Sequence, residues 1–372
     1  MRRLLFGYSN CTFKNGIDKY LLNVINALKN EDVEIDLLTS CYSKEFEEEM
    51  KKFGVNLLTI DRLSHPIKRY KQVSKIVQNR NYFITYFNVS EAFNCICNIA
   101  VKKHSNAIVI THSHNSKNTS SNILKKNILL FAHIICKPLI NKYSDYYYAC
   151  SNVAGDWLFG KNKVANNSNY RIIRNTIDTH KFLFDFQERN KIRNMYGINN
   201  EYVIGFVGNF LEQKNPLFLI EIFDEIRKLH SNVKFFMIGD GHLRQEIENK
   251  IQDNNLCDYV ILTGGIDNVS SYMSAMDALI LPSFFEGLPI VGIEAQVNGL
   301  ECFFSDSITQ EIKISNLAHF ISLKDESRLW AKEILSFLPN DRNKVIQFEN
   351  VMVDSNKQKQ EFIDIFVNDK FK

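Results

Sequence analysis

Short apolar segments alternate with segments of helical periodicity along most of this 372-residue chain. It opens with an apolar run, Arg3–Tyr8, followed by apolar residues at helical spacing over Ile17–Leu28 and a second run, Val33–Thr39. The alternation resumes at Tyr202–Val207 and continues to Ala278–Leu281. Strands that alternate with helices in this way are typical of parallel sheets covered by helices. The chain is therefore expected to be an α/β protein.

Length and one polar segment indicate the domain organisation. A chain of 372 residues is long enough for roughly two domains of ordinary size. Residues 160–170, GKNKVANNSNY, are rich in Asn and Lys and have no apolar period. We therefore expect one domain over residues 1–168 and a second over residues 169–354.

The net charge of +3 conceals an uneven distribution. Residues 1–168 carry 23 basic and 13 acidic side chains, a net of +10, and residues 169–372 carry 22 and 29, a net of −7. Between Arg62 and Asp145, thirteen basic residues stand against two acidic ones. Such a basic half indicates a negatively charged partner, either nucleic acid or an anionic membrane surface.

The segment Ser121–Tyr143 is apolar along one side and carries four lysines. A basic amphipathic helix there could lie on a membrane interface, or it could pack on the core with solvated lysines. Pro138 would kink or end it. No run approaches the ~20 apolar residues of a membrane-spanning helix, and the start of the chain does not look like a signal peptide. With eight scattered cysteines and no Cys-x2-Cys pairs, we expect a reduced, cytoplasmic protein.

Two glutamates, Glu286 and Glu294, have seven residues between them and lie around the start of a predicted helix. Pro289 suits a first helical turn, where its missing N–H costs nothing. The free N–H groups of that turn and the helix dipole favour an anion. Two carboxylates beside such a helix end could hold a diphosphate with hydroxyls on either side, the shape of a sugar nucleotide. A surface glutamate and a half-buried helical glutamate are the alternative interpretation.

Other candidate ligand groups follow predicted strands. His112 and His114 come after the strand Ala107–Thr111, where parallel sheets place ligand groups. These histidines could bind a sugar hydroxyl, or they could make structural hydrogen bonds. A metal site is not indicated, because no third ligand lies nearby in the sequence. Lys214 precedes a predicted helix and could meet a phosphate. Gly16, in the first strand-to-helix turn, could let a ligand approach the backbone or be a plain turn glycine.

These features together resemble the retaining glycosyltransferases of family four, which have the GT-B fold of two facing, doubly wound, Rossmann-like α/β domains. The resemblance covers nearly the whole chain and is strongest over residues 205–299, with Glu286 to Glu294 as the E-x7-E signature. Lys214 in QKN, the GDG of residues 239–241 and the NTID of residues 175–178 support it. The HSHNS and SDSITQEIKI stretches look like the branch that builds capsular polysaccharides and exopolysaccharides in bacteria.

The resemblance implies a role for each matching residue. Glu286 would hold hydroxyls of the donor sugar, Lys214 would neutralise the leaving nucleotide, and His112 or His114 would face the sugar. Glu294 would hold the ribose. The donor site would comprise Gly16, Asn209, Gly239, Gly241, Gly264, Ile266, Gly287, Leu288, Ile290 and Glu294. No cofactor and no metal are expected. The resemblance also implies an acceptor-binding first domain, which residues 355–372 rejoin.

One position departs from the family pattern. The family usually has arginine directly after the glycine that ends the first strand of the second domain, and this chain has Asn209. Asparagine cannot neutralise a phosphate. A loss of ~3 kcal/mol of transition-state stabilisation would slow a reaction roughly a hundredfold. Either Lys214 and a neighbouring arginine suffice, or the enzyme is slow, or the protein binds donor without turnover.

The leading hypothesis is a glycosyltransferase that moves a sugar from a nucleotide-diphosphate donor, a UDP-sugar, to a lipid-diphosphate-linked glycan. It would be cytoplasmic and peripheral on the inner face of the membrane. A UDP-sugar 2-epimerase shares the two-domain fold but lacks the E-x7-E pattern. A nucleic-acid-binding protein would use the basic half, but no recognition helix or stacking-aromatic motif supports it.

Overall fold

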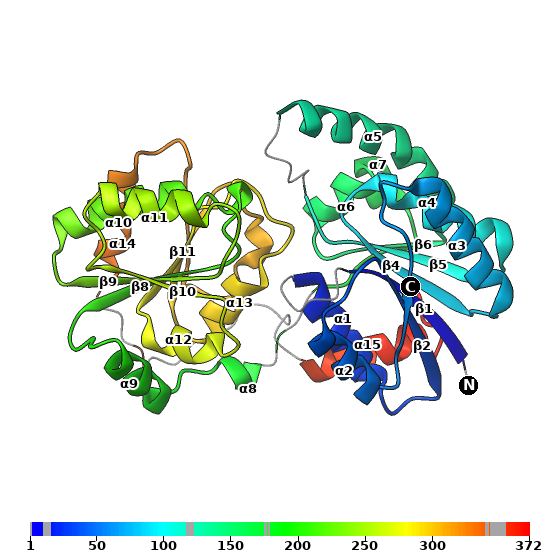
Figure 1. Ribbon diagram of the computed structural model, residues 1–372, viewed down its shortest axis with the longest axis horizontal. Coiled ribbons are helices and arrows are strands. Elements are labelled where there is room, and N and C mark those ends of the chain that lie inside the picture. The colour runs from blue at the N-terminus through cyan, green and yellow to red at the C-terminus, as the bar shows by residue number, and fades with distance from the viewer. Residues whose placement is uncertain are drawn as a thin grey trace. The chain divides into compact units, whose positions relative to one another are not determined.

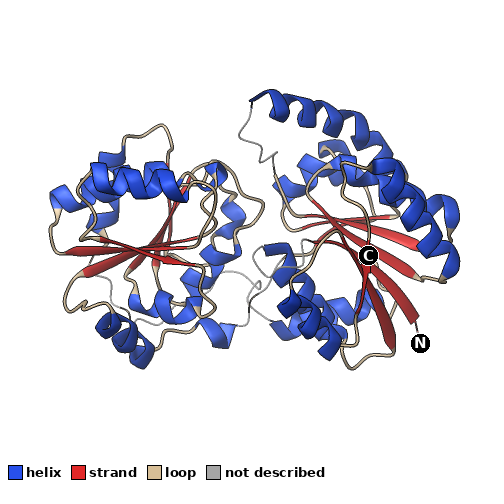
Figure 2. Ribbon diagram, viewed as in Figure 1, coloured by secondary structure: helices blue, strands red, loops and turns tan. Residues whose placement is uncertain are grey.

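The computed structural model describes residues 2–9, 16–116, 123–174, 177, 179–338, 342 and 355–372. The chain divides into two compact units, residues 1–175 with 355–372 and residues 176–354. Each unit is a parallel sheet with helices on both of its faces (Figures 1 and 2). The predicted doubly wound α/β class is confirmed. The boundary between the units lies at 175/176, seven residues beyond the predicted 168/169.

Seven parallel strands form the sheet of the first unit, in the order β3-β2-β1-β4-β5-β6-β7. Alternate side chains of β1 enter opposite cores, Leu4 and Phe6 on one side and Leu5 on the other. Both faces are buried, which explains why the strands are continuous apolar runs. The strands are β1 Arg2–Ser9, β2 Val33–Thr39, β3 Asn56–Thr59, β4 Ile84–Val89, β5 Ile108–Ser113, β6 Tyr146–Ala149 and β7 Tyr170–Ile172.

The last helix of the chain, α15, belongs to the first unit, as predicted. Phe362 and Phe366 share a core with Tyr20 of α1, and Arg171 Nη2 donates to Glu361 Oε1 at 2.7 Å. The helices of this unit are α1 Gly16–Leu28, α2 Lys44–Lys52, α3 Pro66–Asn79, η1 Ala92–Asn94, α4 Cys95–His104, α5 Ile123–Lys142, α6 Asn152–Leu158, α7 Lys161–Asn166 and α15 Ser355–Phe366.

Two segments of the first unit differ from their predictions. The polar segment over residues 160–170 is not the domain boundary: it forms α7 and leads into β7, the seventh strand of the sheet. None of the residues of α7 is buried, so the helix leaves no apolar period in the sequence. Of the two effects predicted for Pro138, a kink or the end of the helix, the second does not occur, because α5 continues to Lys142.

The second unit has six parallel strands in the order β10-β9-β8-β11-β12-β13. They are β8 Tyr202–Val207, β9 Val233–Ile238, β10 Val260–Gly264, β11 Ala278–Leu281, β12 Glu301–Ser305 and β13 Ala318–Ile321. The helices are α8 Thr179–Phe182, α9 Phe186–Met195, η2 Glu212–Lys214, α10 Pro216–Leu229, α11 Arg244–Asp253, α12 Val269–Ala275, α13 Ile290–Val297, η3 Gln310–Ile312 and α14 Ser327–Ser336.

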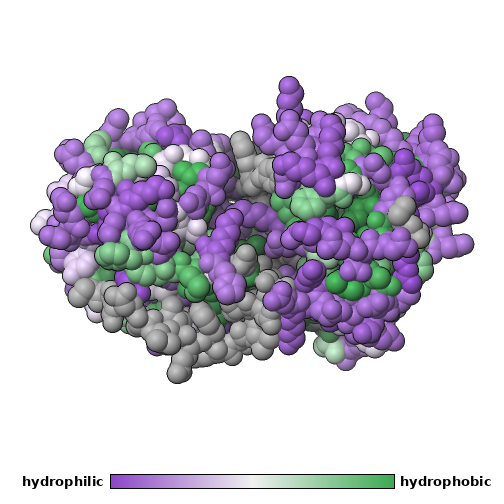
Figure 3. All heavy atoms as spheres, turned by 90° about the horizontal axis from the view of Figure 1, so that it is seen from below, coloured by the Kyte–Doolittle hydropathy of each residue, from purple (hydrophilic) through white to green (hydrophobic). Residues whose placement is uncertain are grey.

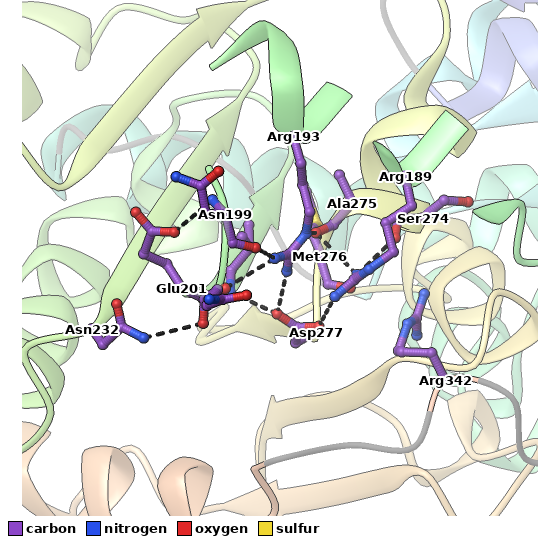
Figure 4. A network of polar contacts seen from close by, with 12 residues as sticks. Arg189, Arg193, Asn199, Glu201, Asn232, Ser274, Ala275, Met276, Asp277 and Arg342 are labelled. Atoms are coloured by element: carbon purple, nitrogen blue, oxygen red, sulfur yellow. Dashed lines mark hydrogen bonds and ion pairs between the residues drawn. The ribbon is translucent and has the colours of Figure 1, made fainter. Parts of the chain in front are cut away.

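Asp277 fastens α9 to the central strands of this sheet (Figure 4). Its two carboxylate oxygens bind Arg189 at 2.6 Å and Arg193 at 2.7 Å. It also accepts the N–H of Val203 at the start of β8, at 2.8 Å. All three charged side chains are largely buried. Because every one has several partners, the group joins helix and sheet without leaving an isolated charge.

The surface carries the polar side chains expected of a face that meets water. Hydrophilic residues predominate on the face in Figure 3, with smaller hydrophobic areas between them. Among the residues that the structure describes, none of the helices has the length and apolar character to cross a membrane.

Candidate active site

The order of the strands places two loops of the second unit beside each other. The sequence order of the strands reverses between β8 and β11, which pair at the centre of the sheet. Open α/β sheets bind ligands beyond the carboxyl ends of the strands at such a switch point. The loop after β8 carries Lys214 and the loop after β11 carries Glu286. Each loop leads directly into a helix, α10 or α13.

Lys214 and Glu286 form an ion pair at this point, with Nζ 2.5 Å from Oε1 and side-chain exposures of 16% and 9%. Gln213 Nε2 donates to Glu286 Oε2 at 3.3 Å and to the carbonyl oxygen of Phe285 at 3.0 Å. In return, the N–H of Phe284 donates to the carbonyl oxygen of Gln213 at 2.9 Å. The two loops therefore hold each other, and an ammonium and a carboxylate are placed side by side.

Helix α13 begins four residues after Glu286. Pro289 precedes its first turn, and no side chain caps its N-terminus. The positive end of the helix dipole thus lies close in sequence to the ion pair, where it favours an anion. Leu288 is buried, and Glu294, in the second turn of α13, is 6% exposed. A Cβ on Gly292 would lie 2.4 Å from Ile312 Cδ1, so this helix packs tightly on its neighbours.

Gln296 holds α13 in place and belongs to none of the motifs in the sequence. Its Nε2 donates to the carbonyl oxygens of Gly292 and Ile312, both at 2.9 Å. Its Oε1 accepts the N–H of Ile314 and the hydroxyl of Ser315, both at 3.1 Å. The buried amide is therefore fully bonded and ties α13 to the segment after β12. The only signal for it was a second polar residue, beside Glu294, in a largely apolar helix.

The predicted donor-binding glycines of the β9 and β10 loops lie at the same edge of the sheet. Gly239 has φ +139°, and a Cβ on it would come within 2.0 Å of the Gly208 carbonyl oxygen. A Cβ on Gly241 would come within 2.4 Å of the carbonyl oxygen of Phe210. Gly264, with φ +71°, ends β10 and accepts the N–H of Gly239 at 2.9 Å. Close approach of the backbone at Gly239 and Gly241, and the positive φ at Gly264, thus account for these glycines even without a ligand.

Asn209 is exposed in the loop between β8 and η2. We expect Asn209→Arg to leave the rate of nucleotide release unchanged or to raise it, because an added guanidinium there would stabilise a phosphate. Initial rates with saturating nucleotide sugar measure the effect. A large loss of rate would mean that Asn209 has a role of its own.

The site residues predicted in the first unit differ in how much of their side chains is exposed to solvent. His112 has no accessible surface, and its Nδ1 lies 2.5 Å from the Tyr86 hydroxyl. His114 is half-buried, and its Nε2 lies 2.7 Å from Asn88 Oδ1. Burial holds the pKa of His112 well below its usual value and lowers that of His114 to about 3. Both rings are therefore neutral at pH 7, and only His114 offers surface to a ligand. Gly16 is exposed at the start of α1.

The NTID stretch falls mostly outside the described residues, which include only Ile177 of its four positions.

Known proteins resemble the chain over its whole length. A solved structure, Anabaena Alr3699/HepE in complex with UDP-glucose, superposes with a TM-score of 0.78, covering 99% of this chain and 100% of that one at 15% identity. "Putative glycosyltransferase EpsF" of Bacillus subtilis (strain 168) is 26% identical over 328 residues, covering 86% of this chain and 84% of its own. The fold is therefore the GT-B fold, and the sequence of the chain is similar to those of glycosyltransferases.

Residues 188–349 match the family model of glycosyl transferases group 1. The Escherichia coli protein "UDP-Gal:alpha-D-GlcNAc-diphosphoundecaprenol alpha-1,3-galactosyltransferase" is 24% identical over 377 residues, covering 95% of both chains. The family resemblance indicated by the E-x7-E motif is therefore confirmed, and the matched residues contain both Lys214 and that motif.

Proposed function

We propose that the protein is a retaining glycosyltransferase that moves a sugar from a UDP-sugar to a lipid-diphosphate-linked glycan during synthesis of a bacterial surface polysaccharide. The observation that carries this proposal is the Lys214–Glu286 ion pair at the switch point of the second sheet, which joins the loop before α10 to the loop before α13. A nucleotide sugar needs a cation and N–H groups for its diphosphate and carboxylates for its hydroxyls. All of these groups occur within this part of the second unit.

In the proposed donor complex, the N–H groups of Gly287, Leu288 and Ile290 bind the diphosphate. Glu286 accepts hydrogen bonds from hydroxyls of the sugar, and Glu294 does so from the ribose. Lys214 stabilises the negative charge that grows on the nucleotide as the bond to the sugar breaks. Groups that are already placed before the reaction stabilise such charge most effectively.

The choice of substrates draws on the relatives. The name of the Escherichia coli protein gives a UDP-sugar donor and a diphosphoundecaprenol-linked sugar acceptor. A Staphylococcus aureus relative is called "Capsular polysaccharide biosynthesis glycosyltransferase CapH" and is 23% identical over 346 residues. We assign the same classes of donor and acceptor to this chain.

The test incubates the protein with UDP-sugars and a panel of short-chain lipid-diphosphate-linked hexoses and N-acetylhexosamines. We expect one UDP-sugar to yield a lengthened glycan with its donor's anomeric configuration, read by NMR, and addition of EDTA to leave the rate unchanged. An inverted product would exclude a retaining enzyme. Release of a free 2-epimeric sugar without transfer would favour the epimerase alternative.

We further propose that α5 places the enzyme on an anionic membrane surface. Figure 1 shows α5 as an outer helix of the first unit. His133 and Ile140 are buried against the unit. The remaining circumference carries the exposed lysines Lys125 and Lys126 and seven exposed apolar side chains: Leu124, Ile128, Leu130, Phe131, Ile134, Ile135 and Leu139. An apolar helix face flanked by lysines suits an interface with anionic lipid.

The double substitution Phe131→Glu and Ile135→Glu is expected to weaken binding to anionic vesicles at least about tenfold. Each apolar side chain buried in the membrane contributes ~1.5–3 kcal/mol to the free energy of binding. Vesicle flotation with and without anionic lipid measures this. Ile67→Glu is the matched control, since Ile67 is 72% exposed on α3. Equal binding of wild type to neutral vesicles, no binding to either, or unaffected variants would reject the membrane contact.

A further inference from the structure

The first sheet has a switch point of its own. Strands β1 and β4 pair at its centre, where the strand order reverses. Asn88, near the end of β4, donates to the carbonyl oxygen of Gly7 in β1 at 3.3 Å. The loop after β4 carries Ser90 and Glu91 and leads into η1. Glu91 therefore lies beyond the carboxyl end of a central strand, where α/β sheets bind ligands.

Both residues that flank Glu91 are held in place by the same pair of rings. Trp157 Nε1 donates to the carbonyl oxygen of Ser90 at 2.8 Å, and the N–H of Ala92 donates to His133 Nδ1 at 3.1 Å. His133 Nε2 donates to the carbonyl oxygen of Trp157 at 3.0 Å, and the two rings stack with centroids 4.0 Å apart. These contacts pre-organise the backbone that carries the Glu91 carboxyl group.

The carboxyl group itself has no such support. Within the described ranges, no hydrogen bond or ion pair reaches the side chain of Glu91, and it does not cap η1. Its half-buried position raises its pKa to about 7, through loss of solvent alone. A half-buried carboxyl group without protein partners leaves its hydrogen bonds to water or to a ligand. A carboxyl group with a strongly shifted pKa, at the edge of a sheet where ligands bind, is therefore a candidate functional group.

The surroundings indicate the chemistry of that ligand. The two rings that hold the flanking residues carry no charge at pH 7: burial lowers the pKa of His133 to about 4, and Trp157, whose indole does not ionise, is half-buried. A carboxyl group beside a phosphate would repel it, whereas sugar hydroxyls donate hydrogen bonds to a carboxylate, and aromatic rings line many ligand sites.

We infer that Glu91 accepts a hydrogen bond from a hydroxyl group of the acceptor sugar, in a subsite formed by the loop after β4 together with Trp157. This inference rests on the proposed glycosyltransferase function and names a binding residue of its acceptor.

The test compares Glu91→Ala, Glu91→Gln and the control Glu48→Gln, in which an exposed glutamate of α2 is changed. The probe is the lipid-diphosphate-linked sugar of the panel that wild type lengthens fastest. For Glu91→Ala, the acceptor KM should rise at least about tenfold, as for loss of one hydrogen bond to a charged group. The donor KM and the slow release of nucleotide without acceptor should stay unchanged, and Glu91→Gln should recover part of the acceptor affinity.

Thermal unfolding shows that the variants are folded and supplies a second readout. The pKa of Glu91 is raised on folding, so the ionised side chain destabilises the native protein increasingly as the pH rises from about 4.5 toward 7. Glu91→Gln should therefore gain melting temperature relative to wild type at pH 8 but not at pH 4.5.

An unchanged acceptor KM in Glu91→Gln and Glu91→Ala would overturn the subsite, as would equal changes in the donor and acceptor KM. Absence of transfer by wild type to every acceptor of the panel would instead overturn the proposed function, and the subsite with it.

Discussion

Replacing Glu286 by alanine is expected to reduce turnover at saturating nucleotide sugar by about 10²–10³-fold, the loss typical for one pre-placed electrostatic group. The carboxylate forms the ion pair with Lys214 and accepts a hydrogen bond from Gln213. Its loss removes the proposed contact to the sugar and also leaves the ammonium group of Lys214 without this partner. Initial rates of nucleotide release measure the effect.

The matched control is Glu246→Ala, because Glu246 is an exposed glutamate on α11 of the same unit. Glu286→Gln keeps the shape and the hydrogen-bonding capacity of the side chain but removes its charge, so its rate should fall between wild type and Glu286→Ala. Unchanged nucleotide release in Glu286→Ala would overturn the assignment of the site.

Replacing Lys214 by alanine is expected to lower turnover by a similar ~10²–10³-fold. The side chain is 16% exposed, and Lys214 ends η2, with one residue between it and α10. Its proposed role is greatest when the leaving nucleotide carries its full charge, so kcat should fall more than the donor KM rises. Initial rates over a range of donor concentrations separate the two constants.

Because Lys214 and Glu286 are in contact, the effects of the two substitutions should not add. The variant with both changes should lose less activity than the product of the two single losses. Lys250→Ala is the control for loss of a surface lysine, since Lys250 pairs with Glu221 on the outer helices of the same unit. A Lys214→Ala enzyme that matched wild type in kcat would exclude the proposed role in the departure of the nucleotide.

The apolar runs and the E-x7-E motif predicted much of the fold and the family. Buried parallel strands leave continuous apolar segments, so β2, predicted over Val33–Thr39, has the observed bounds. Helices with few buried residues leave a weaker signal. The charged helix α11 buries only Ile247 and Ile251, and α2 only Phe46 and Met50, and neither was predicted. β7 was missed because it has only three residues and follows a polar segment.

The candidate site was predictable where motif and topology agree. Lys214 and Glu286 lie in loops after β8 and β11, yet their contact depends on the order of the strands, which the local sequence does not encode. Gln296 holds α13 through hydrogen bonds to a later segment, and His112 and His114 differ in exposure. Both features depend on packing between segments far apart in the chain. Such contacts become visible only in three dimensions.

A crystal structure of the protein with a bound UDP-sugar tests the central claim most directly. We predict phosphate oxygens at hydrogen-bond distance, about 2.7–3.2 Å, from the N–H groups at the start of α13, with Glu286 against the sugar and Glu294 against the ribose. A diphosphate bound away from α13, with neither glutamate in contact with the donor, would contradict the account.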